Sequence, residues 1–375
     1  MREIRKRRKG EFTVNKLLKR ILSVSLVIGL VLTCATGCGG KQGDVAAPAA
    51  SAPAGSAAAP AAGADPYADL PAVTWKFTHS QSADHFQQVA LQAFADYMSE
   101  QSGGKFTVEL FHSGTLGTEQ EVIESMQTGS IAGTVAAASL LANFVPCYNL
   151  FALPALFEDT EQFTGVMTDE AFTAKLQEAS AKAGLIDYGY YQNFFRQIYS
   201  KTPIEKLEDL KAQKIRVMSS DILIDTYQAL GCNSTTTAWT EMYSALQLGV
   251  CDGLDHVPSS VKSMAFYENL GYVCDPNLFV TPMFVIVSQQ MYDKLPEAYQ
   301  QLVDDGINNV LVPKMRELAD TAFDEDLKWL TTEGGLTYTE CDVAAIHEAV
   351  APVRDKYIEQ QEDWVQDLAK QILAR

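Results

Sequence analysis

The strongest constraint on the fold is an alternation of short β-like segments with amphipathic helices. The stretches VTWKFTHS (73–80), FTVELF (106–111) and SIAGTVAAAS (130–139) favour strands. The intervening segments favour helices, the first ending at Gly103–Gly104 and the second starting in a capping box at Thr118–Glu121. Strand, helix, strand, helix, strand predicts an α/β sheet with crossover connections.

The same pattern begins again later in the chain. GLIDYGYY (184–191), KIRVM (214–218) and TPMFVIVS (281–288) favour strands, SSDILIDTYQALG (219–231) favours a helix, and the chain is helical from Pro296. Two α/β patterns in one chain predict two lobes with a cleft between them. Ligands of open α/β sheets bind beyond the carboxyl ends of the strands.

Arg216 stands at the centre of the apolar segment KIRVM, near the predicted carboxyl end of a strand. On an edge strand its guanidinium would point into water. In a cleft it would be held ready for an anion, because the planar fork of arginine matches a carboxylate. Its position just before the helix start at Ser219–Ser220 favours the cleft.

The N-terminus has the pattern of an export signal. A basic segment precedes the apolar run ILSVSLVIGLVLT (21–33), which is shorter than the roughly 20 residues that span a membrane. ATGC then places small residues before Cys38, which resembles the lipobox of bacterial lipoproteins, with Ala35 in place of the usual leucine. We expect a signal peptide at 1–37 and lipidation at Cys38; an uncleaved anchor or a simple secretory signal are alternatives.

Composition excludes several functions for the part after this signal. Residues 38–69 are rich in Ala, Pro, Gly and Ser and predict a flexible tether. The net charge is −18, and the rest is more acidic still because the first twenty residues are basic, so we expect no nucleic-acid partner. The sequence holds no HEXXH, GxGxxG or Walker motif, and we expect neither a metal nor a cofactor.

Several stretches, in order, resemble the substrate-binding proteins of tripartite ATP-independent periplasmic (TRAP) transporters, of the C4-dicarboxylate-binding type. These stretches are SGGKFTVELFHSGTLGTEQEVIESMQTGSI, LANFVPCYNLFALPALFED, FFRQIYSKTPIEKLEDLKAQKIRVM, TEMYSALQLGVCDG and MFVIVSQQMYDKL. The resemblance implies a two-lobed periplasmic-binding-protein-like α/β fold with hinge strands, a long connecting helix and a ligand cleft. It also implies a receptor that binds an organic acid without turnover. The loaded receptor would dock on the small and large membrane subunits of a sodium-driven permease.

The resemblance also implies domain limits and a location. The expected parts are lobe I at 70–193, lobe II at 194–281, a return to lobe I and the long helix at 282–321, and C-terminal helices packed on lobe II at 322–375. The protein would be an exported lipoprotein of the cell membrane that faces the extracytoplasmic side, in the periplasm or at the cell surface.

Two arginines correspond to those of the family. Arg216 matches the arginine of the KIRVP motif that pairs with the ligand carboxylate, with Met218 in place of proline. Arg196 in FFR matches a second arginine, and Phe194 stands where the family has glycine, so Phe194 would crowd the wall of the site. For Arg196, a structural ion pair is the alternative.

Further residues are carried over in the same way. Trp239 would stack on or cover the ligand, His256 takes the place of an asparagine, and His79 and His85 match positions near the ligand in some members. Trp239, Phe194 and nearby tyrosines hint at an apolar or aromatic body on a mono- or dicarboxylate. Two other functions stay open: the ligand sensor of a signalling receptor, and an exported hydrolase or lyase of organic acids, for which we find no activated nucleophile.

Overall fold

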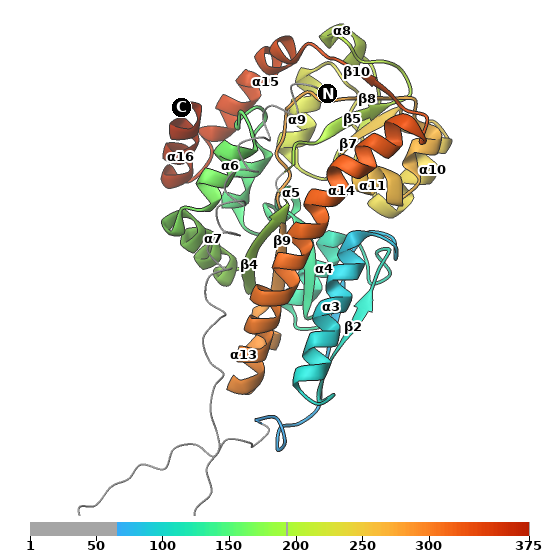
Figure 1. Ribbon diagram of the computed structural model, residues 1–375. Coiled ribbons are helices and arrows are strands. Elements are labelled where there is room, and N and C mark those ends of the chain that lie inside the picture. The colour runs from blue at the N-terminus through green and yellow to red at the C-terminus, as the bar shows by residue number, and fades with distance from the viewer. Residues whose placement is uncertain (1–65, 193, 375) are drawn as a thin grey trace, which may run out of the picture. The chain divides into compact units, whose positions relative to one another are not determined.

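The computed structural model describes residues 66–192 and 194–374, which form two α/β lobes, each built on a five-stranded sheet (Figure 1). The sheet of lobe I has the strand order β2 (Phe106–Phe111), β1 (Val73–Thr78), β3 (Gly133–Ala137), β9 (Met283–Ser288), β4 (Leu185–Gln192). The sheet of lobe II has the order β10 (Thr337–Thr339), β8 (Tyr272–Cys274), β5 (Gln197–Ser200), β7 (Gly253–His256), β6 (Ile215–Arg216). The expected two-lobed α/β fold is confirmed.

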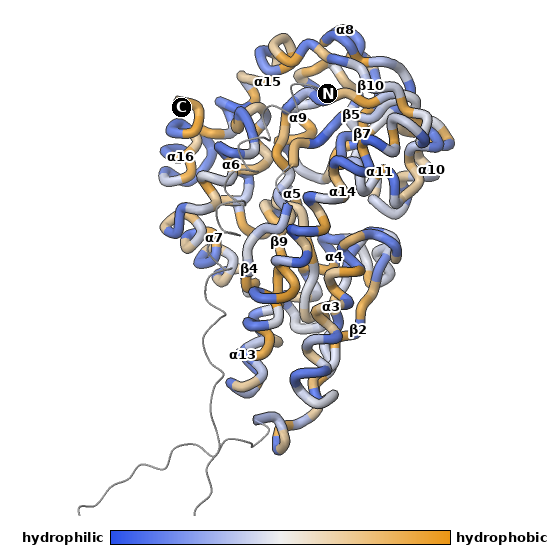
Figure 2. The backbone as a smooth tube through the Cα atoms, viewed as in Figure 1, coloured by the Kyte–Doolittle hydropathy of each residue, from blue (hydrophilic) through white to orange (hydrophobic). Residues whose placement is uncertain are grey.

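The sheet of lobe I mixes parallel and antiparallel strands. β1 pairs in parallel with β2 and β3, whereas β9 runs antiparallel between β3 and β4. β9 has the sequence MFVIVS, and its Phe284–Val287 segment is completely buried, as a strand covered on both faces requires. Figure 2 shows this strand as predominantly hydrophobic.

The sheet of lobe II has the short strand β6 at one edge. β5 pairs antiparallel with β7 and β8, and β6 pairs in parallel with β7. β6 contains only Ile215 and Arg216, which is shorter than the predicted segment KIRVM, because the chain turns at Met218–Ser220 into α9 (Asp221–Ala229). This turn leaves Arg216 at the last position of the strand.

Helices cover the faces of both sheets. The segments that build lobe I contribute α3 (Phe86–Gln101), α4 (Glu119–Gln127), α5 (Ala138–Leu141), η1 (Pro146–Ala152), α6 (Thr160–Met167), α7 (Glu170–Lys182) and α12 (Gln289–Tyr292). Those of lobe II contribute α8 (Leu207–Leu210), α9, η2 (Trp239–Glu241), α10 (Met242–Gln247), α11 (Pro258–Ser263) and η3 (Phe266–Asn269). The predicted capping box at the start of α4 is present, with Thr118 and Glu121 bonded to each other's backbone.

Two chain crossings and one long helix join the lobes. The segments Phe194–Arg196 and Phe279–Thr281 run side by side: Arg196 N donates to Phe279 O at 3.0 Å, and Thr281 N donates to Phe194 O at 2.9 Å. The long helix comprises α13 (Glu297–Gly306), the π-helical η4 (Ile307–Leu311) and α14 (Val312–Thr332). α14 contacts β4 in lobe I and α11 in lobe II, so one helix touches both lobes (Figure 1).

The C-terminal helices divide between the two lobes. α15 (Val343–Ile358) packs on α9 of lobe II, but α16 (Asp363–Leu373) packs on η1. The sequence analysis placed both helices on lobe II; α16 instead buries Val365 and Ile372 in the cluster that holds Phe163 and Phe172 of lobe I. The remaining domain limits stay a prediction. No helix within the described residues has both the length and the apolar composition of a membrane span.

Candidate functional site

A cavity of about 260 Å³ lies between the lobes, where β1, β3, β6 and β7 end. Its polar lining from lobe I comprises Ser80, Gln81, His85, Gln87, Thr118, Glu119, Gln120 and Gln192. Its polar lining from lobe II comprises Arg216, Ser219, Thr236, Thr237, Thr240, His256 and Ser260, together with the indole of Trp239. Strand ends from both sheets therefore face a common space, which is the arrangement that the sequence predicts.

Arg216 is held rigidly at the wall of this cavity. Its side chain is 5% exposed, and Arg216 Nε donates to Thr237 O at 2.9 Å. Arg216 Nη1 is buried and has no hydrogen-bond partner within the described residues. Burial and the neighbouring Arg196 lower the pKa of Arg216 to about 10, so the guanidinium stays charged at neutral pH. A fixed, charged donor that faces a cavity can bind an anion.

Trp239 and His256 extend the wall beside Arg216. The Trp239 ring centroid lies 5.6 Å from Arg216 Cζ and 4.5 Å from the His256 ring centroid. Burial, with the charges of Arg196 and Arg216, lowers the pKa of His256 well below its ordinary value, so its imidazole is neutral. Trp239 Nε1 and His256 Nδ1 have no partner among the described residues. The structure therefore brings these three predicted residues together at the cavity.

Lobe I contributes a histidine and a carboxylate. His85 caps α3, with Nδ1 accepting from Gln87 N at 3.3 Å, and burial lowers its pKa to about 3. Glu119, the first residue of α4, accepts from Ser80 Oγ at 2.9 Å and from Ala137 N at 3.4 Å. Burial raises the pKa of Glu119, and these hydrogen bonds and the charge of Arg216 oppose that rise.

The sequence analysis did not identify Glu119. Its segment TEQE predicts a capping box, which accounts for Thr118 and Glu121 but not for the residue between them. One signal could have pointed to Glu119: it follows the loop beyond the carboxyl end of a predicted strand, where ligands of α/β sheets bind.

Arg196 lies behind the cavity rather than in it. Arg196 Nη2 donates to Asp255 Oδ1 at 2.7 Å and to Asp255 O at 3.2 Å, and neither side chain is more than 4% exposed. Arg196 borders a void of about 10 Å³, which is too small for an organic acid. This geometry is that of a structural ion pair, which was the alternative interpretation of Arg196. The carboxylate partner lies on strand β7 and not on a helix.

Two other predicted residues also lie outside the lining. His79 Nε2 pairs with Gln88 Oε1 at 2.8 Å, and burial lowers the pKa of His79. The Phe194 ring packs on Phe323 of the long helix, with 4.4 Å between the centroids. Of the aromatic residues that suggested an apolar ligand body, only Trp239 lines the cavity in the described part of the chain. Cys38 falls outside the described residues.

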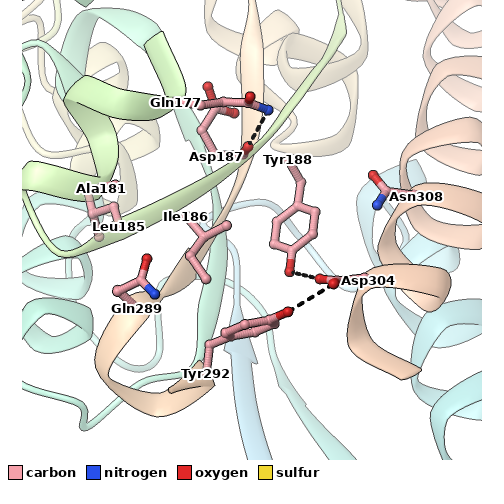
Figure 3. Close-up of a pocket in the computed structure, with 10 residues that line it drawn as sticks. All are labelled: Gln177, Ala181, Leu185, Ile186, Asp187, Tyr188, Gln289, Tyr292, Asp304 and Asn308. Atoms are coloured by element: carbon pink, nitrogen blue, oxygen red, sulfur yellow. Dashed lines mark hydrogen bonds between the residues drawn. The ribbon is translucent and has the colours of Figure 1, made fainter. Parts of the chain in front are cut away.

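A second, more open hollow of about 470 Å³ lies between β4, α12 and α13 (Figure 3). Tyr188 Oη and Tyr292 Oη both donate to the Asp304 carboxylate, at 2.6 and 2.8 Å. None of the predicted site residues lines it. The carboxylate is already bonded by both tyrosines, so the cavity between the lobes remains the candidate site.

Comparisons with known proteins identify the family of the chain. The model of the bacterial extracellular solute-binding proteins, family 7, matches residues 77–361. A TRAP periplasmic solute-binding protein of Sulfitobacter sp. NAS-14.1, solved with bound β-D-galacturonate, gives a TM-score of 0.75 at 27% identity over 79% of this chain and 98% of its own. One of Pseudomonas putida F1, with bound D-glucuronate, gives 0.75 at 28% identity over 81% and 97%. The C4-dicarboxylate-binding periplasmic protein of Vibrio cholerae is 25% identical over 70% of this chain and 79% of its own.

Proposed function

Because the chain belongs to family 7 of the bacterial extracellular solute-binding proteins, we propose that it is an exported receptor that binds an organic acid between its lobes and delivers it to a TRAP-type secondary transporter. The relatives described above are binding proteins, and two were solved with a bound acid, which supports binding without turnover. The permease subunits and a lipid anchor at Cys38 belong to the same proposal, which for these parts rests on the sequence.

The single observation that carries the proposal is the guanidinium of Arg216. It is buried, charged and fixed through Nε, while Nη1 has no partner in the described residues and Arg216 lines the cavity. A buried charge without a partner is costly. An anion that pairs with Arg216 therefore contributes more binding free energy than an anion that pairs with an exposed arginine. Each charge-assisted hydrogen bond contributes about 1.5–3 kcal/mol, so a carboxylate on Arg216 accounts for roughly two decades of affinity.

The test is a thermal-shift screen with organic acids. The protein is first unfolded and refolded to remove any acid that is carried through purification, and then tested with dicarboxylates, 2-oxo acids, aromatic acids, sugar acids and amino acids. A ligand at 100 times its Kd stabilises the fold by about 2.7 kcal/mol, which gives a measurable shift. Each active acid is then tested on Arg216→Ala and Arg216→Lys.

A matched control is Arg316→Ala. Arg316 is exposed and donates to Tyr190 O, so the control removes a guanidinium that does not line the cavity. We expect the acid-induced shift to vanish in Arg216→Ala, to weaken in Arg216→Lys, which keeps the charge but not the fork, and to persist in the control. An acid whose shift is unchanged in Arg216→Ala would show that the carboxylate site lies elsewhere.

A further inference from the structure

Two cysteines of lobe II lie close together although they are far apart in the sequence. Cys274 is the last residue of β8, and Cys341 follows the end of β10 by two residues. β8 and β10 pair in parallel, with Cys274 opposite Thr339 (Figure 1). Cys274 is buried in the hydrophobic cluster that holds Ile346 of α15, and Cys341 packs against the same cluster. The pairing of the two strands therefore brings the two thiols to one place.

The two side chains interact directly and differ in exposure. The Cys274 thiol donates a hydrogen bond to the sulfur of Cys341. This bond and burial raise the pKa of Cys274, whereas the same bond lowers the pKa of Cys341. Cys274 is 1% exposed, and Cys341 is half-buried. Cys341 is thus the more acidic thiol and the one that a reagent in solvent can reach, with Cys274 behind it.

Further contacts fix the segment that carries Cys341 against the loop that follows β8. Cys341 Sγ donates to Asp275 O at 3.4 Å. His347 Nε2, one turn into α15, lies 3.0 Å from the carbonyl oxygens of both Pro276 and Asn277. A disulfide forms without rearrangement of the backbone only between cysteines that are already held next to each other. These contacts meet that requirement.

Neither the cavity nor a metal site accounts for the pair. Neither cysteine lines the cavity between the lobes. In the part of the chain that the structure describes, no group of three or more His, Cys, Asp or Glu side chains could hold a metal ion. The chain belongs to a family of extracellular binding proteins and is therefore exported. Disulfides form and persist outside the cytoplasm, where cysteines are not kept reduced.

We propose that Cys274 and Cys341 form a disulfide once the protein is exported, and that this bridge fastens the start of α15 to β8 in the sheet of lobe II. The five cysteines of the described residues are thiols in this structure, so the proposal concerns its oxidised form. The bridge is independent of the acid that the cavity binds.

The oxidant is an external disulfide. The Cys341 thiolate attacks one sulfur of that disulfide, and the other sulfur leaves as a thiolate. Cys274 then loses its proton to water, attacks Cys341 Sγ and expels the remaining external sulfur. In total, the two cysteines give up two protons and two electrons and gain one S–S bond, and the external disulfide is reduced to two thiols.

The bridge would close a long loop, which contains β9 and the whole of the long helix. A cross-link restricts the unfolded chain more when the loop that it closes is longer. We therefore expect oxidation to raise the temperature of unfolding by about 5 °C or more.

The first test locates the bridge by mass spectrometry. The protein is oxidised with glutathione disulfide, unfolded in urea with an alkylating reagent, and digested without reduction. We expect a pair of peptides joined through Cys274 and Cys341, while Cys147, Cys232 and Cys251 are alkylated. Alkylation of both Cys274 and Cys341 would overturn the proposal, and so would a glutathione adduct that persists on Cys341.

The second test compares thermal unfolding of the oxidised protein with and without dithiothreitol, in the wild type, Cys341→Ser and Cys232→Ser. Cys232 is a matched control, because it is buried and donates to Leu210 O instead of to another thiol. Dithiothreitol should lower the unfolding temperature of the wild type and of Cys232→Ser by about 5 °C or more, and leave that of Cys341→Ser unchanged.

Each comparison is made within one variant, so a loss of stability from the substitution itself does not affect it. An equal effect of dithiothreitol on Cys341→Ser and on the wild type, or no effect on the wild type, would overturn the proposal. Neither outcome bears on the proposed function, whose test is the acid-induced shift at Arg216.

Discussion

Replacing Arg196 by methionine should destabilise the fold far more than it changes ligand recognition. The variant removes the 2.7 Å bond from Arg196 Nη2 to Asp255 Oδ1 and leaves a carboxylate that is 1% exposed. Arg216 and the Tyr227 hydroxyl also lower the pKa of Asp255, but neither replaces the direct bond from Arg196. Breaking a buried ion pair from one side costs about 3–5 kcal/mol, because the remaining charge is uncompensated. Urea unfolding at pH 7, followed by circular dichroism, measures this loss.

Two controls separate the ion pair from the volume of the side chain. The double variant Arg196→Met with Asp255→Asn removes both charges, so its loss of unfolding free energy should be smaller than the sum of the single losses by about 2 kcal/mol or more. Burial raises the pKa of Asp255 and Arg196 lowers it. Without Arg196 the folded-state pKa rises further, so the deficit of Arg196→Met should shrink as the pH falls from 7 toward 4.

One result would refute this reasoning. If Arg196→Met unfolds at the urea concentration of the wild type but loses its acid-induced stabilisation, then Arg196 contacts the ligand and the pair with Asp255 is not what holds it in place. The role that the family resemblance implies for Arg196 would then be correct.

Two further predictions concern lobe I. Burial raises the pKa of Asp187 from 3.8 to about 6, so ionisation of Asp187 removes roughly 3 kcal/mol of stability as the pH rises from about 4 to 6, and Asp187→Asn should lack this contribution. The asparagine amide can donate to Tyr148 Oη and accept from Gly189 N, the partners of Asp187 at 2.6 and 2.7 Å, so the variant keeps both contacts. Parallel pH profiles of the wild type and the variant in urea unfolding would contradict this prediction. Asp169 caps α7 by accepting from the backbone N–H groups of residues 171 and 172. Asp169→Ala should lower the free energy of unfolding by about 1 kcal/mol and leave ligand affinity unchanged. A urea midpoint equal to that of the wild type would count against this prediction.

Much of the fold could be predicted from local patterns. Alternating and helical periodicities locate the strands and helices because each side chain's burial follows from its position in a regular element. The capping box at Thr118 was visible for the same reason, since its two partners are three residues apart. Strand order was not visible. β9 inserts between β3 and β4 long after both in the sequence, and no local period encodes which distant strand it pairs with.

Pattern and spacing alone predicted a site residue only where its role depends on its own strand end, whereas Trp239, His256 and His85 were predicted from the family resemblance. Arg216 follows from its place at the end of β6. Arg196 is similar in type, yet its role is decided by Asp255, which approaches it from β7 because β5 and β7 pair. Glu119 likewise acquires its role from β1 and β3, which place Ser80 and Ala137 against it. Roles that depend on a partner across a sheet or between lobes require the assembled fold.

The polar groups of the cavity connect ligand binding to the relation between the lobes. Arg216 Nη1 comes from lobe II and Gln81 Oε1 from lobe I, and each is buried without a partner in the described chain. Leaving such groups unsatisfied costs about 1–3 kcal/mol each, so this arrangement of the lobes is stabilised by a ligand that bonds to both sides. The paired segments Phe194–Arg196 and Phe279–Thr281 are the short crossings about which the lobes could separate. An acid that pairs with Arg216 but reaches no group of lobe I would gain the carboxylate contact without stabilising this arrangement of the lobes.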